Sequence, residues 1–145
     1  MVKNLWQKNL DILWGMFKMN NKKDYHEYVF NDGKLIGKFE EMYRYSKNTP
    51  WHQDEIENFP DINISKTILN IKSPYDSVLE IGCGLGYYLN EIEGMCKNKE
   101  KIWGADISNT AIEKAGKLFP HLKFSGADIS TESYVDLLTK MGGQI

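Results

Sequence analysis

The sequence predicts an α/β protein with a parallel β-sheet in the second half of the chain, and two observations support this prediction. Between residues 75 and 145, short apolar runs alternate with amphipathic helical patterns in the order strand, helix, strand, helix, strand, helix. This order is typical of parallel strands joined by right-handed helical crossovers. Residues 1–74 show helical periodicity without that alternation. We therefore expect an N-terminal helical segment (1–74) followed by an α/β half-domain (75–145).

The N-terminal segment begins with an amphipathic pattern. Apolar residues recur at steps of three and four over residues 3–18, which predicts a helix with one apolar face. A second helical pattern runs from Leu35 to Tyr43, and Asn31-Asp32-Gly33 before it is typical of a turn. Both helices need a surface against which to bury their apolar faces.

Residues 51–59 lie between Pro50 and Pro60 and have no clear period. They are rich in aromatic and acidic side chains, which favours an irregular segment or a short helix. A further short helix is expected over residues 65–71.

The α/β half-domain contains three expected strands and three expected helices. The strands are short, mostly apolar runs over residues 77–81, 101–107 and 123–129. The helices cover residues 87–95, a stretch from Thr110 onward and a stretch after Ser130. Thr110 and Glu113 can form a capping box for the second helix, and Ser130 can cap the third.

Composition and charge narrow the range of functions. The chain carries 18 Lys and Arg against 20 Asp and Glu, so no basic field favours nucleic acid or anionic lipid. Cys83 and Cys96 are the only cysteines, too few for a disulfide framework and without the spacing of metal ligands. No stretch reaches membrane-spanning length, and the N-terminus lacks a signal-peptide pattern. We expect a cytoplasmic protein with no nucleic-acid partner, no membrane partner and no metal.

A glycine-rich loop, Glu80-Ile81-Gly82-Cys83-Gly84-Leu85-Gly86, stands between the first strand and the first helix of the half-domain. Because glycines lack side chains, a ligand can lie against the backbone there and use its amide groups. The loop also opens a helix, whose amino end favours negative groups such as a carboxylate. A dinucleotide-binding loop has the pattern GxGxxG, and Tyr87 stands where that pattern needs glycine. An NAD-dependent dehydrogenase is therefore a poor fit.

Acidic residues end the second and third strands. Asp106 lies 24 positions after Gly82, and a carboxylate at this point faces the ribose of a ligand lying across the strand ends. It can accept hydrogen bonds from both ribose hydroxyls. Asp128, followed by Ile129, ends the third strand in the same way. Taken singly, each aspartate is also compatible with a helix cap or turn residue.

In this order and at this spacing, the three elements resemble the cofactor-binding motifs of class I S-adenosylmethionine-dependent methyltransferases. The resemblance covers residues 75–145 and implies a Rossmann-like parallel sheet with strand order 3-2-1. It implies that Glu80 helps to orient the methionine moiety, that Asp106 binds the ribose and that Asp128 accepts from the adenine amino group. The other implied cofactor contacts are Gly82, Cys83, Gly84 and Gly86 beside the methionine moiety, Ile107 on the adenine ring and Ile129 in the adenine-contacting motif. The cofactor would be S-adenosylmethionine, with S-adenosylhomocysteine as the product.

The resemblance also implies a part that the sequence given does not contain. Complete members of that family have a seven-stranded sheet whose fourth strand lies beside the first, and the sequence stops at Ile145 before such a strand. We expect an exposed, apolar sheet edge that is covered by a homodimer partner or by a missing C-terminal half. The missing part is also where such enzymes usually keep a catalytic base, so catalytic residues stay unassigned.

The N-terminal segment is expected to form a lid and part of a substrate pocket. Trp51 and His52 are the candidate substrate contacts, and His52 can serve as a general base near neutral pH. The alternative is that Trp51 packs within the fold and that His52 is an exposed or capping residue.

Two functions follow from these patterns. The first is methyl transfer from S-adenosylmethionine to an oxygen or nitrogen atom of a small-molecule acceptor. The second is a truncated or non-catalytic methyltransferase-like module that binds the cofactor, or that acts on a partner protein through its N-terminal helices.

Overall fold

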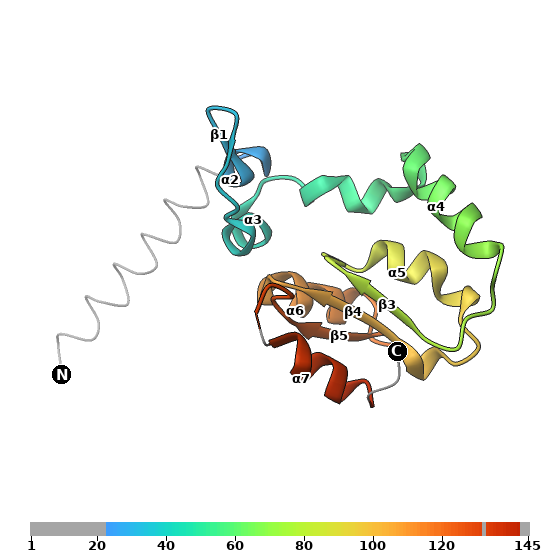
Figure 1. The fold of residues 1–145 in the computed structure, drawn as a ribbon. Coiled ribbons are helices and arrows are strands. Elements are labelled where there is room, and N and C mark those ends of the chain that lie inside the picture. Colours follow the sequence, from blue (N-terminus) through green and yellow to red (C-terminus); the bar gives the residue numbers. More distant parts are fainter. Residues whose placement is uncertain (1–22, 132, 143–145) are drawn as a thin grey trace.

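The computed structural model describes residues 23–131 and 133–142, which form a mixed α/β fold (Figure 1). The helix expected over residues 3–18 lies outside the described residues. The segment before the large sheet contains α2 (His26–Val29), β1 (Phe30–Asn31), β2 (Lys34–Leu35), α3 (Phe39–Tyr45), the 3-10 helix η1 (Pro50–Asn58) and α4 (Pro60–Asn70). The part with the large sheet contains β3 (Val78–Ile81), α5 (Tyr87–Ile92), η2 (Glu93–Met95), η3 (Lys99–Lys101), β4 (Ile102–Asp106), α6 (Asn109–Leu118), β5 (Lys123–Gly126) and α7 (Ser133–Lys140).

The large sheet is parallel, and its strand order is β3-β4-β5. In the register of the sheet, Ile81 of β3 pairs with Ala105 of β4, and Asp106 of β4 pairs with Gly126 of β5. The carboxyl ends of all three strands therefore meet at one edge of the sheet. The predicted parallel α/β architecture and the predicted order of its three strands are confirmed.

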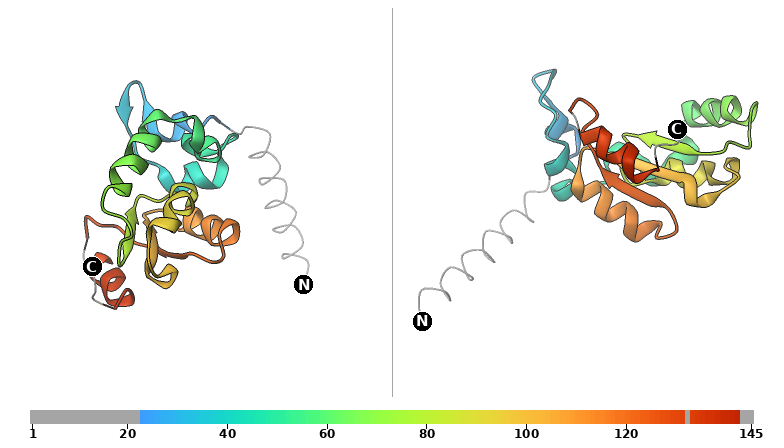
Figure 2. Two further views of the ribbon diagram at one scale, coloured as in Figure 1. Left: turned by 90° about the vertical axis from the view of Figure 1, so that its right-hand side faces the viewer. Right: turned by 60° about the horizontal axis from the view of Figure 1, so that its bottom comes forward.

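Helices cover both faces of this sheet (Figure 2). On one face, Leu89 and Ile92 of α5 pack in a buried cluster with Ile102 and Leu122. On the other face, Leu137 of α7 packs in a separate cluster with neighbours in and after β4 and β5, among them Ala105 and Ala127. This division follows from the alternation of side chains along each strand. The sheet core accounts for the apolar runs that predicted the strands.

A third cluster joins the N-terminal segment to the large sheet. Val29 of α2 and Met42 and Tyr43 of α3 pack with Leu85 of the glycine loop and with Ala111 of α6. Buried apolar contact of this kind stabilises the position of a segment that has few strands of its own. The N-terminal segment is thus held against the end of the sheet where the strands finish (Figure 1).

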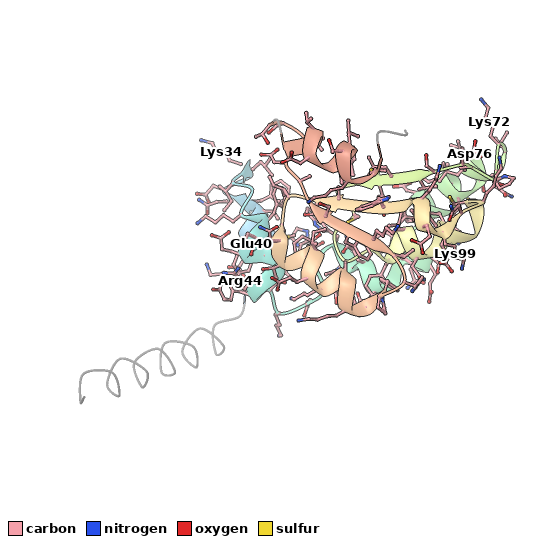
Figure 3. All side chains as sticks on the ribbon, turned by 90° about the horizontal axis from the view of Figure 1, so that it is seen from below. Lys34, Glu40, Arg44, Lys72, Asp76 and Lys99 are labelled. Atoms are coloured by element: carbon pink, nitrogen blue, oxygen red, sulfur yellow. The ribbon has the colours of Figure 1, made fainter. Side chains whose placement is uncertain are left out.

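A polar junction strengthens the same contact between α3 and α6. Glu40 of α3 accepts hydrogen bonds from the Ser108 hydroxyl at 2.7 Å and from the Thr110 amide and hydroxyl at 3.1 and 2.5 Å. Arg44, one turn further along α3, donates at 2.6 Å to Oε1 of Glu40, the oxygen that also accepts from the Thr110 hydroxyl (Figure 3). These hydrogen bonds hold the pKa of Glu40 low, at about 2, against an ordinary 4.5.

This junction corrects the predicted capping box. Ser108, not Thr110, is the N-cap of α6, and its hydroxyl oxygen accepts a hydrogen bond from the Ala111 amide at 3.1 Å. The hydroxyl of Thr110 instead donates to Glu40, which comes from a distant part of the chain. Ser108 and Thr110 are both of types that cap helices. The Thr110 hydroxyl donates to Glu40, 70 positions away, so Ser108 is the residue that caps α6.

The boundaries of the N-terminal helices were also partly wrong. The turn predicted at residues 31–33 is present and joins β1 to β2, but the hairpin continues through Leu35. Leu35 is 66% exposed, and Gly37 has a positive φ of 60°, so α3 begins only at Phe39. Residues 51–59 fall mostly within η1, as predicted for an irregular or short helical stretch, and α4 begins at Pro60, five residues earlier than expected.

The last strand and helix also differ from the prediction. β5 ends at Gly126 and not at Ile129, because the chain after Gly126 turns to place Asp128 beside Ser130. Ser130 was expected to cap the last helix, but its amide and hydroxyl both donate to Asp128, and α7 begins only at Ser133.

Among the described residues, β3 pairs with β4 alone, so its other edge carries no strand. A hollow of about 210 Å³ beside this strand is lined by Leu69, Tyr75, Ser77, Val78, Leu79, Ile92 and Met95. Within the same described part of the chain, no helix has the length and apolar character needed to cross a membrane.

Candidate functional site

The carboxyl ends of the three parallel strands open into a cavity of about 370 Å³. Its lining comes from the strand ends and from the N-terminal segment, and consists of Phe39, Tyr43, Trp51, Gln53, Ile81, Gly82, Asp106, Ile107, Ala127, Asp128 and Ile129. Ligand sites in open α/β sheets lie outside these ends of the strands, and a cavity of this size is typical of them. We call it the strand-end cavity.

Asp106 is the most deeply placed acidic residue of the strand-end cavity, with only 7% of its surface exposed. One carboxylate oxygen accepts a hydrogen bond from the Gly84 amide at 2.9 Å, and the other accepts from the Ser108 amide at 2.8 Å. Each oxygen of a carboxylate has two acceptor positions, so each keeps one for a ligand. Asp106 therefore positions the glycine loop and still faces the cavity.

Asp128 and two isoleucines form the opposite part of the strand-end cavity. The Asp128 carboxylate accepts from the Ser130 amide at 2.9 Å and from its hydroxyl at 2.6 Å, which lowers its pKa. Ile107 and Ile129 are 55% and 54% exposed although both are large apolar residues. Apolar surface beside two carboxylates suits a ligand with a flat apolar ring and polar groups at its rim.

The glycine loop bends through left-handed backbone conformations. Gly82, Gly84 and Gly86 have φ values of 75°, 54° and 81°, which a residue with a side chain adopts only at a cost. At Gly84 a side chain would also collide with Gln53 and with the Tyr43 hydroxyl. At Gly82 there is no atom within 4 Å of such a side chain. The absence of a side chain at Gly84 thus lets the N-terminal segment pack against the loop. At Gly82 the space that a side chain would fill is empty.

Gln53 holds the N-terminal segment on this loop. Its side-chain carbonyl oxygen accepts a hydrogen bond from the Leu85 amide at 2.9 Å. The residues before it, Trp51 and His52, have positive φ values of 57° and 49°, uncommon for residues other than glycine. Strained backbone of this kind is found where a segment is held in place by its surroundings, often beside a binding site.

A second cavity of about 300 Å³ lies on the other side of Gln53, and we call it the glutamate cavity. Its lining consists of Trp51, Gln53, Ile56, Phe59, Asp61, Ile62, Glu80, Cys83, Tyr87 and Tyr88. Trp51 and Gln53 line both cavities, so these two side chains form the border between them.

Glu80 is the unusual residue of the glutamate cavity. Its Oε2 atom is buried and has no hydrogen-bond partner among the described residues. Burial and, to a smaller extent, the negative charge of Asp106 raise its pKa to about 8, and the Leu89 amide acts in the opposite direction. A buried acceptor without a partner costs about 1 to 3 kcal/mol, and such groups are concentrated at functional sites.

Cys83 lines the glutamate cavity together with Glu80. Its thiol is buried, and burial with the nearby charges of Glu80 and Asp106 raises its pKa well above the ordinary value. A thiol in that state is a packing group and not a nucleophile.

The structure places the predicted site residues in two groups. Gly82, Asp106, Ile107, Asp128 and Ile129 line the strand-end cavity, and Glu80 and Cys83 line the glutamate cavity. Gly84 and Gly86 shape the loop but line neither of the two cavities.

The two candidate substrate residues have different positions. Trp51 lines both cavities. His52 lines neither, is exposed, and makes an edge contact with the Tyr25 ring at 5.8 Å between centroids. Its place in the structure gives no support to a role as general base.

Sequence patterns did not reveal Phe39, Tyr43 or Gln53, which also line the strand-end cavity. Phe39 and Tyr43 belonged to an apolar helical pattern, which predicted a helix and not a place in a cavity. Nothing in the sequence pointed to Gln53, because its partner at Leu85 lies 32 positions away.

Among the residues that the structure describes, no group of three His, Cys, Asp or Glu side chains is placed to hold a metal ion. In comparisons with known proteins, no family model matches the sequence and no curated protein matches it. The function must therefore be argued from the geometry of the two cavities.

Proposed function

We propose that the chain binds S-adenosylmethionine and takes part in methyl transfer to an oxygen or nitrogen atom of a small-molecule acceptor. The observation that carries the proposal is the meeting of a glycine loop and two strand-end aspartates around one cavity. Asp106, Asp128 and their neighbouring isoleucines suit the ribose and adenine of a nucleoside. The resemblance of the three motifs to those of class I methyltransferases adds the identity of the cofactor.

The described residues fit such a cofactor at both of its ends. The strand-end cavity has carboxylates for hydroxyl and amino donors and exposed isoleucine surface for a flat ring. The unpartnered oxygen of Glu80 suits a positively charged amino group, such as that of the methionine moiety. Because Trp51 and Gln53 form the border between the cavities, a ligand that reaches from Asp128 to Glu80 passes beside them.

The chemistry of the bound cofactor is simple. Bound S-adenosylmethionine would supply an activated methyl group, which an acceptor lone pair could take while sulfur keeps the electron pair of the broken bond and the acceptor's proton goes to solvent or a base. The contribution of this chain is to hold the ribose at Asp106, to fix the loop through Gly84, and to exclude water with Tyr43, Trp51 and Gln53. None of these residues is assigned as the base.

The rest of the proposal concerns organisation and setting. Residues 1–74 act as the lid and substrate segment and residues 75–145 as the cofactor half-domain. A second copy of the chain, or further sequence, covers the open edge of β3. The two cysteines are both free thiols, which supports a reducing, cytoplasmic location.

A non-catalytic module is the second candidate, and one observation favours it. Two amides of the glycine loop, those of Gly84 and Leu85, already donate to Asp106 and Gln53. Internal partners of this kind let the loop keep its shape without a cofactor. A protein that uses the fold only as a scaffold would need only these internal hydrogen bonds to hold the loop.

Calorimetric titration with S-adenosylhomocysteine tests the proposal. We expect saturable binding to the folded chain and a loss of roughly ten- to a hundredfold in affinity for Asp106→Asn, the scale of a lost buried hydrogen-bond partner. Asp136→Asn changes an exposed carboxylate on α7 and should bind as the unaltered chain does. If the folded chain binds no S-adenosylhomocysteine, the proposal fails and the scaffold function takes its place.

A further inference from the structure

The glutamate cavity has two facing walls, and only one of them belongs to the cofactor motifs. Glu80, Cys83, Tyr87 and Tyr88 form the wall on the side of β3 and α5. The facing wall comes from η1 and α4 and consists of Ile56, Phe59, Asp61 and Ile62. The motifs account for the first wall and leave the second without a function.

The facing wall combines apolar surface with one charge. Phe59 is 38% exposed, and so is Trp51 at the border of the cavity. Large aromatic side chains that face a cavity and stay exposed are typical of ligand contacts, and their faces attract cations. Asp61 is the charged residue of this wall.

The lining of the glutamate cavity offers no positive charge. Glu80 and Asp61 contribute carboxyl groups from opposite walls, and the lining contains no Lys, Arg or His. The proposed function gives the Oε2 atom of Glu80 to the amino group of the cofactor, so Asp61 is the carboxylate that remains for an acceptor. A negatively charged ligand in this cavity would have no cationic partner, and a neutral ligand would leave the Asp61 carboxylate without one.

We propose that the glutamate cavity binds the methyl acceptor and that this acceptor is an organic cation, an amine carried on an apolar or aromatic body. The proposal rests on the proposed function and names the substrate class of the same site. The apolar body lies between Phe59 and the tyrosines of α5, and the positive group lies toward Asp61. The positive group serves recognition, so the proposal adds no step to the transfer itself.

Three probes of one shape test this inference on the full chain at pH 7. They are 2-phenylethylamine, which is positively charged, 2-phenylethanol, which is neutral, and phenylacetate, which is negatively charged. Calorimetry in the presence of saturating S-adenosylhomocysteine should show that the amine binds at least about tenfold more tightly than the alcohol. Phenylacetate should not bind. Equal binding of the three probes, tighter binding of phenylacetate, or no binding by any of them would overturn the inference.

A pair of variants tests whether Asp61 is responsible for the preference for the amine. Asp61→Asn should reduce the preference for the amine about threefold to fivefold, since Asp61 is exposed to solvent. Glu57→Gln removes the same charge from an exposed residue of η1 that does not line the cavity, and should leave the preference unchanged. An unchanged preference in Asp61→Asn, or an equal loss in both variants, would contradict the assignment of the facing wall.

The same samples distinguish the inference from the proposed function. Binding of S-adenosylhomocysteine without any preference for the amine overturns the acceptor class and leaves the cofactor site standing. A preference for the amine in a chain that does not bind S-adenosylhomocysteine, measured without it, supports a cation site and overturns methyl transfer.

Discussion

Two glutamates, one in α3 and one in β3, have opposite environments. Glu40 lies at the junction of α3 and α6, where Ser108, Thr110 and Arg44 donate to its carboxylate and its pKa falls to about 2. Glu80 lies at the end of β3, where its Oε2 atom is buried without a partner and its pKa rises to about 8. One carboxylate is satisfied within the fold, and the other is not.

The difference indicates that Glu40 serves the fold, and under the proposed function Glu80 serves the ligand. The contribution of Glu40 to stability is present above pH 4.5 and is lost as the pH falls toward 2. The sign is reversed for Glu80: its raised pKa makes the folded chain lose stability as the pH rises from 4.5 toward 8. Groups that cost stability at neutral pH are concentrated at functional sites, which agrees with the role proposed for Glu80.

The glycine loop joins these two regions, and a pair of alanine substitutions tests that connection. Gly82→Ala should lower the free energy of unfolding by about 1 to 2 kcal/mol, because the left-handed backbone disfavours a side chain. Gly84→Ala carries the same backbone cost and also collides with Gln53 and Tyr43, so it should cost about 1 to 3 kcal/mol more. Urea unfolding measures both variants. Equal losses would mean that the N-terminal segment is not held on the loop.

The Glu40 junction can be removed while the fold is kept. Glu40→Gln should lower the free energy of unfolding by about 1 kcal/mol at pH 7, a modest value because the side chain is 37% exposed and solvent screens its charge. The loss should shrink as the pH falls from 4.5 to 2, since protonation removes the same contribution from the unaltered chain. Thermal unfolding at several pH values measures this.

Glu41→Gln, on the exposed side of the same helix, is the matched control and should change little. If Glu40→Gln had the same free energy of unfolding as Glu41→Gln at every pH, the junction would contribute nothing to stability.

The sequence predicted the regions around Glu80 and Glu40 unequally well. Around Glu80, the apolar run, the alternating glycines and the two aspartates follow from local patterns, because the ends of parallel strands must meet at one edge of a sheet. Around Glu40, the contacts join residues some 70 positions apart, and local propensity does not encode them. The capping box was assigned to Thr110 for this reason.

The N-terminal segment shows the same limit. The apolar pattern from Leu35 to Tyr43 suggested one helix, but the hairpin and the positive φ of Gly37 delay its start to Phe39. Gln53 acts through a single hydrogen bond to the glycine loop, and no pattern in the sequence could reveal it. The strand-end residues that line the cavity were therefore predictable, whereas Phe39 and Gln53 of the N-terminal segment were not.

The state of the Glu80 carboxyl group tests the central claim most directly. Carbon-13 NMR of the side-chain carboxyl, assigned by its absence in Glu80→Gln, gives the pKa of this group with and without saturating S-adenosylhomocysteine. We predict a pKa of about 8 in the free chain, and a clear fall when the ligand's positive amino group becomes the missing partner. A pKa near the ordinary 4.5 in the free chain, or a raised pKa that S-adenosylhomocysteine leaves unchanged, would contradict the account.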